Sequence, residues 1–215
     1  PPRIRREHLL DQESDTMRRV KKFAVPLVGV GVLALAAWPV YAHCGKCAGD
    51  CKEVLKQMEA GKLTAASMIA TAEAHAKGKA VGLMIDLEKD KMDADVFVLV
   101  GDKVQAVAIG ADGKAGKMDE VKSMTGMAAV IQAMDAAKVT MGAVIAAAEE
   151  KSKGKALAVT ASATGGKASF EVYCLAGDKI QNVTVDNAGK ATGMAEAKML
   201  PAAANEEKPK PKPGG

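Results

Sequence analysis

One segment of the chain occurs twice, and this internal repeat constrains the fold more than any other feature. A shift of 76 residues superimposes the two copies without a gap. The matched runs are Lys62 with Lys138, Lys77-Gly78-Lys79-Ala80 with Lys153-Gly154-Lys155-Ala156, and Gly101-Asp102-Lys103 with Gly177-Asp178-Lys179. Self-similarity at such a period marks a complete supersecondary unit. We therefore expect one structural unit to occur twice, in residues 52–125 and 126–200.

Each repeat begins with sequence that favours helices. Short helices are predicted over Glu53 to Glu59 and over Ala129 to Asp135. An Ala-rich helix follows in each repeat, with Thr64 and Thr140 as the expected N-caps, because a threonine hydroxyl can accept from the first free backbone N–H groups. These helices are predicted to stop at Gly78 and Gly154, since glycine adopts the left-handed conformation of a C-cap.

Three strands are predicted after the helices of each repeat, because apolar residues then alternate with period two. They cover Val81 to Leu87, Ala94 to Val100 and Val104 to Ile109, and then Leu157 to Ala163, Phe170 to Leu175 and Ile180 to Val185. Gly101-Asp102 and Gly177-Asp178 suit tight hairpin turns. The expected fold class is α+β, with two tandem units, each a helix on a three-stranded antiparallel sheet, preceded by a short helix. Since so small a unit buries little apolar surface, the copies should pack together or continue each other's sheet.

Residues 17–42 have the pattern of a signal peptide. Four basic residues, Arg18, Arg19, Lys21 and Lys22, precede the apolar run Phe23 to Trp38. Small residues at Val40 and Ala42 suit signal peptidase, so we predict cleavage after Ala42 and a periplasmic or secreted protein. The alternative is an uncleaved anchor, but the run has 16 residues, fewer than the roughly 20 of a membrane-spanning helix. The membrane is then met only transiently, and residues 1–16 are expected not to belong to the native protein.

Charge and composition exclude one class of partner. Outside residues 1–42 the chain carries 23 basic and 22 acidic residues, so the exported part is almost neutral. It has no basic face interleaved with aromatic residues, and we therefore expect no nucleic-acid partner. Residues 201–215 alternate Lys and Pro near the end. They are predicted to form a disordered, extended tail, either a solvated spacer or a contact for an anionic envelope polymer.

The second repeat contains Ser169-Phe170-Glu171-Val172-Tyr173-Cys174, followed by a strand that closes in Val185-Asp186-Asn187-Ala188-Gly189. Together with the Lys-Val-Thr start, the Ala-rich helix and Gly-Lys-Ala, this pattern resembles the PepSY domain. Two residues separate Asp186 from Gly189, one fewer than the family pattern has, and Gly110 stands at the place of Asp186 in the first repeat. The resemblance covers Lys62 to Ala115 and Lys138 to Ala191.

This resemblance implies a binding or regulatory module and no catalytic residue. PepSY units occur in metalloprotease propeptides and in envelope proteins, and the family has been linked to inhibition of peptidases. The implied function is that of a non-enzymatic exported protein that binds a protein or peptide partner in the cell envelope, or restrains a peptidase. An exposed sheet edge could pair with an extended segment of such a partner.

Reactive side chains gather only in the Cys-rich segment 43–51, which has no counterpart in the second repeat. The candidate metal ligands are His43, Cys44, Cys47 and Cys51. Three thiols and an imidazole could hold one Zn or Cu ion, which would make the protein an envelope metal-binding or thiol-redox protein. Alternatively, these cysteines form disulfides with one another or with Cys174, which is expected to be buried on its strand, and the protein then has no cofactor.

Other candidate site residues have ordinary structural explanations. His75 is expected on the surface of a helix. Glu73 and Glu149 recur at equivalent positions and are expected to belong to a solvated, salt-bridging helix face. The twelve Met residues are scattered and are expected to fill the core.

Overall fold

A computed structural model describes residues 47–88 and 90–201 of the chain. The predicted signal peptide and its cleavage site, the segment before it, His43, Cys44 and the Lys/Pro tail beyond Pro201 lie outside the described residues.

The four predicted helices are present. They are α1 (Cys47–Ala60), α2 (Ala65–Ala76), α3 (Met127–Ala137) and α4 (Met141–Ser152). Thr64 and Thr140 are the N-caps of α2 and α4, as predicted, and each hydroxyl accepts from the backbone N–H three residues later. At Thr64 the cap is reciprocal, because Ser67 Oγ accepts from the Thr64 backbone N–H.

Gly78 and Gly154 end these helices for a different reason from the one predicted. The left-handed residues are the preceding lysines, Lys77 with φ 55° and Lys153 with φ 56°. Glycine is required because the chain passes very close to a neighbouring strand, so that a Cβ at Gly78 would collide with the carbonyl oxygen of Leu99. Close backbone approach, and not backbone conformation, therefore selects glycine at these two turns.

The six predicted strands are present, and each repeat has a fourth. The strands are β1 (Lys79–Glu88), β2 (Lys91–Val100), β3 (Lys103–Gly110), β4 (Ala115–Glu120), β5 (Lys155–Thr164), β6 (Lys167–Ala176), β7 (Lys179–Val185) and β8 (Ala191–Ala197). They form one antiparallel sheet in the order β4-β3-β2-β1-β5-β6-β7-β8. The prediction of three strands per repeat therefore missed one strand in each repeat. Gly, Ala and charged residues dominate β4 and β8, so neither has the alternation that marks a half-buried strand.

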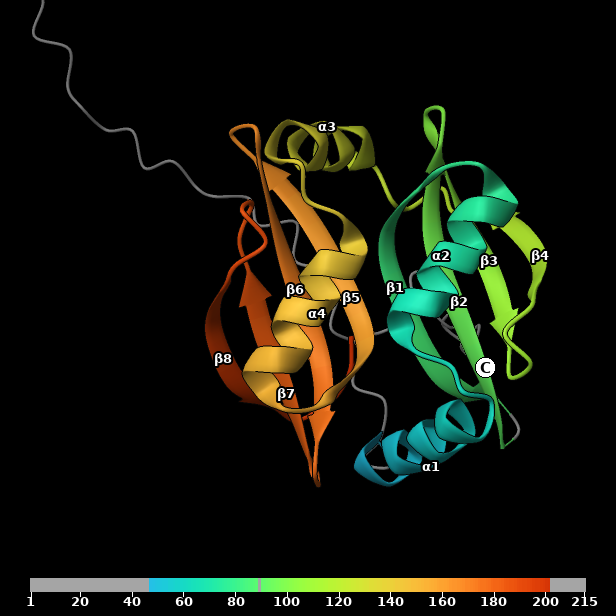
Figure 1. The fold of residues 1–215 in the computed structure, drawn as a ribbon. Coiled ribbons are helices and arrows are strands. Elements are labelled where there is room, and N and C mark those ends of the chain that lie inside the picture. The colour runs from blue at the N-terminus through green and yellow to red at the C-terminus, as the bar shows by residue number, and fades with distance from the viewer. Residues whose placement is uncertain (1–46, 89, 202–215) are drawn as a thin grey trace, which may run out of the picture. The chain divides into compact units, whose positions relative to one another are not determined.

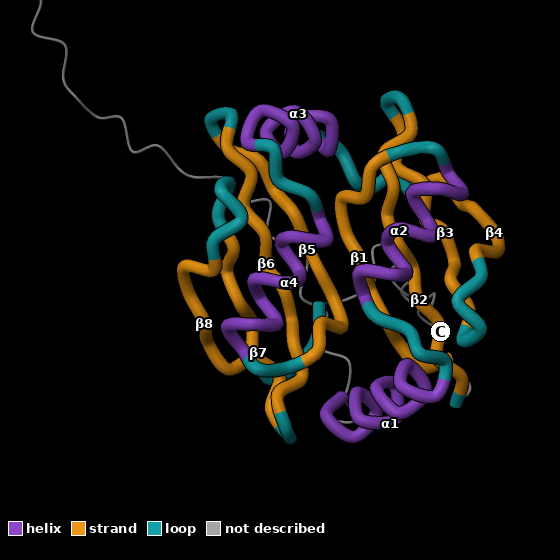
Figure 2. Tube along the Cα trace, viewed as in Figure 1, coloured by secondary structure: helices purple, strands orange, loops and turns teal. Residues whose placement is uncertain are grey.

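Helices α2 and α4 lie on the same face of this sheet (Figure 1), and Figure 2 shows the helical layer in front of the strands. Both helices contact strands of their own repeat and also each other. The largest fully buried side chains are Phe97, Phe170, Met68, Leu83, Ile85, Ile109, Met141, Ile145, Leu157, Val81, Val96 and Val98. They come from both repeats and belong to one continuous core.

The repeats join where β1 meets β5. Leu83 pairs with Val159 and Met84 with Ala158, in antiparallel orientation. Leu83 and Val159 are themselves equivalent positions under the shift of 76 residues. A local two-fold axis therefore passes between them, and the second repeat continues the sheet of the first as one subunit of a symmetric dimer continues another.

Helices α1 and α3 lie at opposite ends of the strands and connect the repeats (Figure 1). In the second turn of α1, Lys52 forms an ion pair with Asp178 in the β6–β7 turn. At the opposite ends of the strands, Asp135 of α3 forms an ion pair with Lys79 of β1. Each of these exposed ion pairs joins residues of different repeats.

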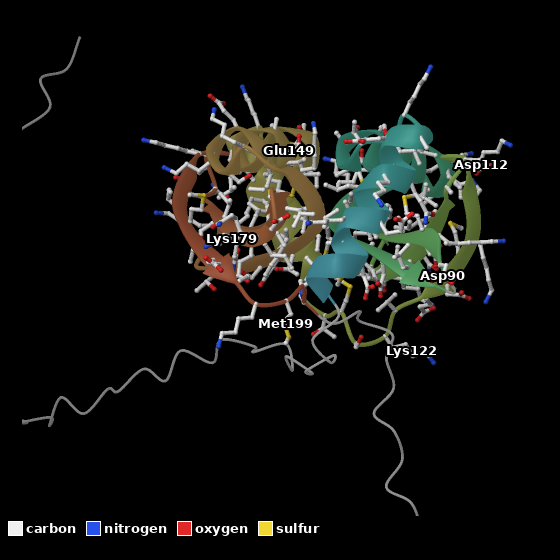
Figure 3. All side chains as sticks on the ribbon, turned by 90° about the horizontal axis from the view of Figure 1, so that it is seen from below. Asp90, Asp112, Lys122, Glu149, Lys179 and Met199 are labelled. Atoms are coloured by element: carbon white, nitrogen blue, oxygen red, sulfur yellow. The ribbon has the colours of Figure 1, made fainter. Side chains whose placement is uncertain are left out.

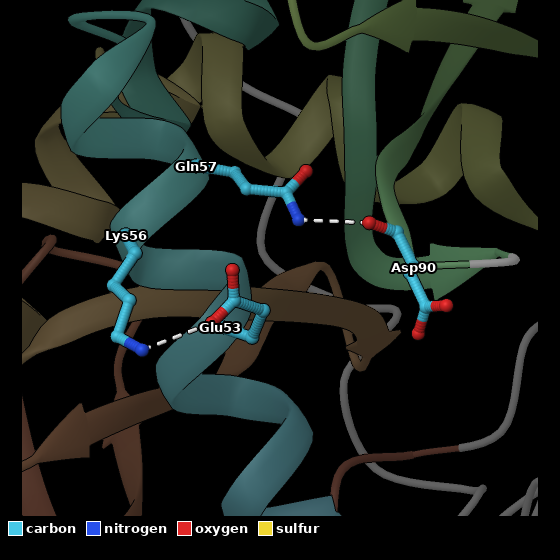
Figure 4. A network of polar contacts seen from close by, with 4 residues as sticks. All are labelled: Glu53, Lys56, Gln57 and Asp90. Carbon is cyan, nitrogen blue, oxygen red and sulfur yellow. Dashed lines mark hydrogen bonds and ion pairs between the residues drawn. The ribbon is translucent and has the colours of Figure 1, made fainter.

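Gln57 attaches α1 to the β1–β2 turn. Its side-chain nitrogen donates to the Asp90 carbonyl oxygen at 3.0 Å, and its side-chain oxygen accepts from the Met92 N–H at 2.7 Å. Figure 4 shows the first of these bonds beside the Lys56–Glu53 ion pair within α1. A single amide thus satisfies two backbone groups at the turn.

Within the described part of the chain, no single helix is long and apolar enough to cross a membrane. The helices α3 and α4 reach that length and hydropathy only as a pair bent by 79°.

We expect Gly78→Ala to lower the free energy of unfolding by about 1–3 kcal/mol, because the added methyl group meets the backbone of β2. Gly142→Ala in α4 is the matched control. Its Cβ would have no neighbour closer than 4.0 Å, so alanine should stabilise the protein by about 0.4–1 kcal/mol. Urea unfolding followed by circular dichroism measures both changes, and equal effects of the two substitutions would contradict the close approach at Gly78.

Candidate functional site

The structure describes only part of the predicted metal site. Cys47 is the first residue of α1, and Cys51 follows one turn later. Cys51 is 3% exposed and belongs to the core, whereas His43 and Cys44 lie outside the described residues. The metal site of His43, Cys44, Cys47 and Cys51 therefore stays a prediction. Such a site would include the buried side chain of Cys51.

Cys174 is a fully buried thiol in β6. Burial raises the pKa of this thiol to about 11; a hydrogen bond with Ser152 opposes the rise, and the nearby Glu149 carboxylate adds to it. Because the thiolate is the nucleophile and the metal ligand, Cys174 is neutral and unreactive at neutral pH. The prediction that it fills space on its strand is confirmed.

The thiol should make stability depend on pH. Its pKa is about 11 in the folded chain, above the ordinary value of 9.0, so its contribution is complete below pH 9 and is lost as the pH rises to about 11. We expect the free energy of unfolding to fall in this interval by on the order of 1 kcal/mol per pH unit more than in Cys174→Ala. Urea titrations of both proteins at several pH values measure the difference. Parallel pH profiles would contradict the burial of an ionisable thiol.

Glu73 and Glu149 do not belong to the solvated face that was predicted for them. The Glu73 carboxylate accepts from the Ala80 N–H at 2.8 Å, and the Glu149 carboxylate (Figure 3) accepts from the Ala156 N–H at 3.0 Å. Ala80 and Ala156 stand at the irregular places where β1 and β5 bulge. The two recurring acids therefore bind backbone N–H groups beside the bulges.

The described residues hold no group of three or more His, Cys, Asp or Glu side chains close enough to bind a metal ion. His75 is exposed in the last turn of α2, as predicted. A hollow between the β2–β3 turn and the start of α3 is lined by residues that include Leu99 and Met124. Its Lys103 and Glu120 form an ion pair with each other, so they do not point to a ligand.

The two end strands of the sheet are the remaining candidate site. β4 lies at one end and β8 at the other, and each has a described hydrogen-bonded neighbour on one side only. Nearly all residues of both strands are exposed or partly exposed. A strand end of this kind presents a row of backbone donors and acceptors that can pair with another extended chain.

Each end strand presents one large apolar side chain to solvent. Met118 in β4 is 43% exposed and Met194 in β8 is 48% exposed, and they are the large hydrophobic residues that remain exposed in the described part of the chain. They occupy equivalent positions in the two repeats and pair with buried Val107 and Val183. All twelve methionines were expected to fill the core, but these two do not.

The end strands differ in charge. One ion pair occurs in both, since Lys103–Glu120 and Lys179–Glu196 occupy equivalent positions. β4 also carries Lys117 and Asp119 on either side of Met118, where β8 has Gly193 and Ala195. β4 is thus a charged edge, whereas β8 presents small uncharged side chains around Met194.

Acidic residues adjoin β4 on the sheet. Burial, and then the charges of Asp93 and Asp119, raise the pKa of Asp95 above its usual range. Ala106 lies in β3, the strand between Asp95 of β2 and the end strand, and it pairs with Asp119 of β4. Asp119 of β4 therefore lies close enough to Asp95 for their charges to interact.

The sequence repeat shows that Met118 and Met194 are equivalent, but not that they are exposed, since Met58 and Met134 superimpose under the same shift and are buried. They were missed because β4 and β8 were not predicted as strands. Without those strands the sheet has different ends, so neither methionine could be assigned to an edge.

Comparisons with known proteins do not assign the chain to a family. No protein-family model matches it, and no curated protein is significantly similar to it. One solved structure, a candidate lipoprotein from Clostridium difficile, aligns with 13% identity over 60% of this chain and 90% of that one, with a TM-score of 0.36. A likeness at this level carries no argument about fold or function.

Proposed function

We propose that this is a non-enzymatic exported protein of the cell envelope that binds an extended segment of a protein partner along β8. The observation that carries the proposal is the exposed Met194, whose neighbours Gly193 and Ala195 in β8 carry no charge. The resemblance of both repeats to PepSY units supports the same function and points to a peptidase as one class of partner. The signal-like segment 17–42 supports a periplasmic or secreted location.

Strand addition explains how such an edge would bind. Backbone groups on the outer side of β8 would pair with those of the incoming segment and give affinity, while pockets for alternate side chains give specificity. Gly193 and Ala195 leave room for the partner's side chains on one face of the sheet. Met194 offers a flexible apolar contact on the other face, a kind of side chain that adapts to different partners.

A photo-reactive residue in place of Met194 should cross-link an envelope protein other than this chain, whereas the same residue in place of Met118 should not. Introducing Gly193→Lys together with Ala195→Asp gives β8 the charges of β4, and we expect cross-linking to fall about tenfold. The matched control, Lys117→Gly with Asp119→Ala, removes those charges from β4 and should leave cross-linking from position 194 unchanged. Mass spectrometry of the cross-linked product identifies the partner. Equal capture from both edges, or no capture together with unchanged extracellular proteolysis, would contradict the proposal.

A second function, metal binding or thiol redox chemistry, rests on the segment 43–51. The observation that favours it is that Cys47 and Cys51 are one turn apart in α1, a spacing at which two residues lie on one side of a helix. His43 and Cys44 would complete a set of four ligands for Zn or Cu.

We expect the double substitution Cys44→Ser with Cys47→Ser to abolish metal binding without unfolding the protein, because it leaves the buried Cys51 in place. Native mass spectrometry of protein exported with its own leader measures bound metal, and alkylation under denaturing conditions counts thiols. A wild-type mass lighter by two or four protons, without metal, would assign these cysteines to disulfides and contradict the second function.

A further inference from the structure

The charged edge strand β4 has a pattern that is complementary to itself. Lys117 and Asp119 lie on either side of Met118, and their charged atoms are 2.8 Å apart on one face of the sheet. We propose that β4 binds β4 of a second copy of this chain, antiparallel and centred on Met118. The resulting contact is a closed, two-fold symmetric dimer in which one sheet runs through both copies.

The charges select a single register for this pairing. With Met118 opposite Met118, Lys117 of each copy lies opposite Asp119 of the other, so two oppositely charged cross-strand pairs form. In such a pairing, two residues that lie directly opposite each other have their side chains on the same face of the sheet. The two-fold axis therefore always passes beside a residue of β4, and the neighbouring registers are centred one residue away, on residue 117 or residue 119. Centring on Lys117 or on Asp119 would place like charges directly opposite each other, which is destabilising.

Both charges and the central side chain are accessible. The Lys117 side chain is 78% exposed and that of Asp119 is 57% exposed, and Met118 offers an apolar contact at the centre. Charge complementarity therefore identifies the occupant of this edge as the same strand of another copy.

The opposite edge lacks these features, although it descends from the same repeat pattern. Gly193 and Ala195 replace the two charged residues, so pairing of β8 with itself has no opposite charges beside Met194 that would select a register. The fold already contains an antiparallel contact of the proposed kind, because β1 and β5 pair at the equivalent positions Leu83 and Val159. Pairing through β4 leaves both β8 strands at the outer ends of the combined sheet.

The proposed contact is limited to one short strand and its neighbours. Such a small interface is expected to give a weak, concentration-dependent dimer. The dimer should weaken at high salt, because its register depends on exposed charges.

Sedimentation velocity over a range of concentrations tests this proposal on the full exported chain. We expect Lys117→Asp and Asp119→Lys, each alone, to raise the dimer dissociation constant about tenfold or more, because like charges then face each other. The double variant Lys117→Asp with Asp119→Lys restores opposite charges and should dimerise as the wild type does. An equimolar mixture of the two single variants should form a mixed dimer, since each supplies the charges that the other requires.

Met118→Asp and Met194→Asp are matched controls, because they introduce the same charge at equivalent exposed positions. In a symmetric β4 contact, residue 118 of one copy faces residue 118 of the other copy, so only Met118→Asp should abolish the dimer. A wild-type chain that stays monomeric, single variants that dimerise normally, or a dimer lost through Met194→Asp would overturn the proposal. These measurements contain no partner protein, so their failure would leave partner binding at β8 unaffected.

Discussion

The pairing of β1 with β5 is the contact on which the rest of the structure depends. It removes two strand edges from solvent and buries Leu83 and Val159 completely. A single repeat of about 75 residues would bury a smaller fraction of its surface than the joined repeats do. By joining the sheets at equivalent residues, the chain builds one core from two small units and leaves only the last strand of each repeat, β4 and β8, at an end of the sheet.

The consequence for function lies in the divergence of those two ends. Duplication places the same backbone, the same Lys–Glu ion pair and the same exposed methionine at both. Residues 117 and 119 then distinguish them, because one edge carries opposite charges at positions where the other has Gly193 and Ala195. Charged end strands resist unselective strand addition. This difference is the basis for proposing different partners at the two edges: a matching copy at β4 and an extended foreign segment at β8.

Several residues that a sequence-based interpretation assigns to the surface have structural roles. Glu73 and Glu149 look like members of a salt-bridging helix face, yet both accept from backbone donors at strand bulges. Gly78 looks like a left-handed cap, yet it is glycine because another strand passes beside it. Such roles depend on a neighbour far away in the sequence, which local propensity does not report.

The sequence by itself determined the α+β class, the four helices and six of the strands, because helix caps, glycine stops and apolar periodicity are local properties. It also determined that the copies would associate, and that Cys174 would be buried. Only the tertiary structure decided that the copies share one sheet, that β4 and β8 are its ends, and that Met118 and Met194 are exposed there. Those facts depend on which strands pair across the chain, and pairing between distant segments is a property of the whole core.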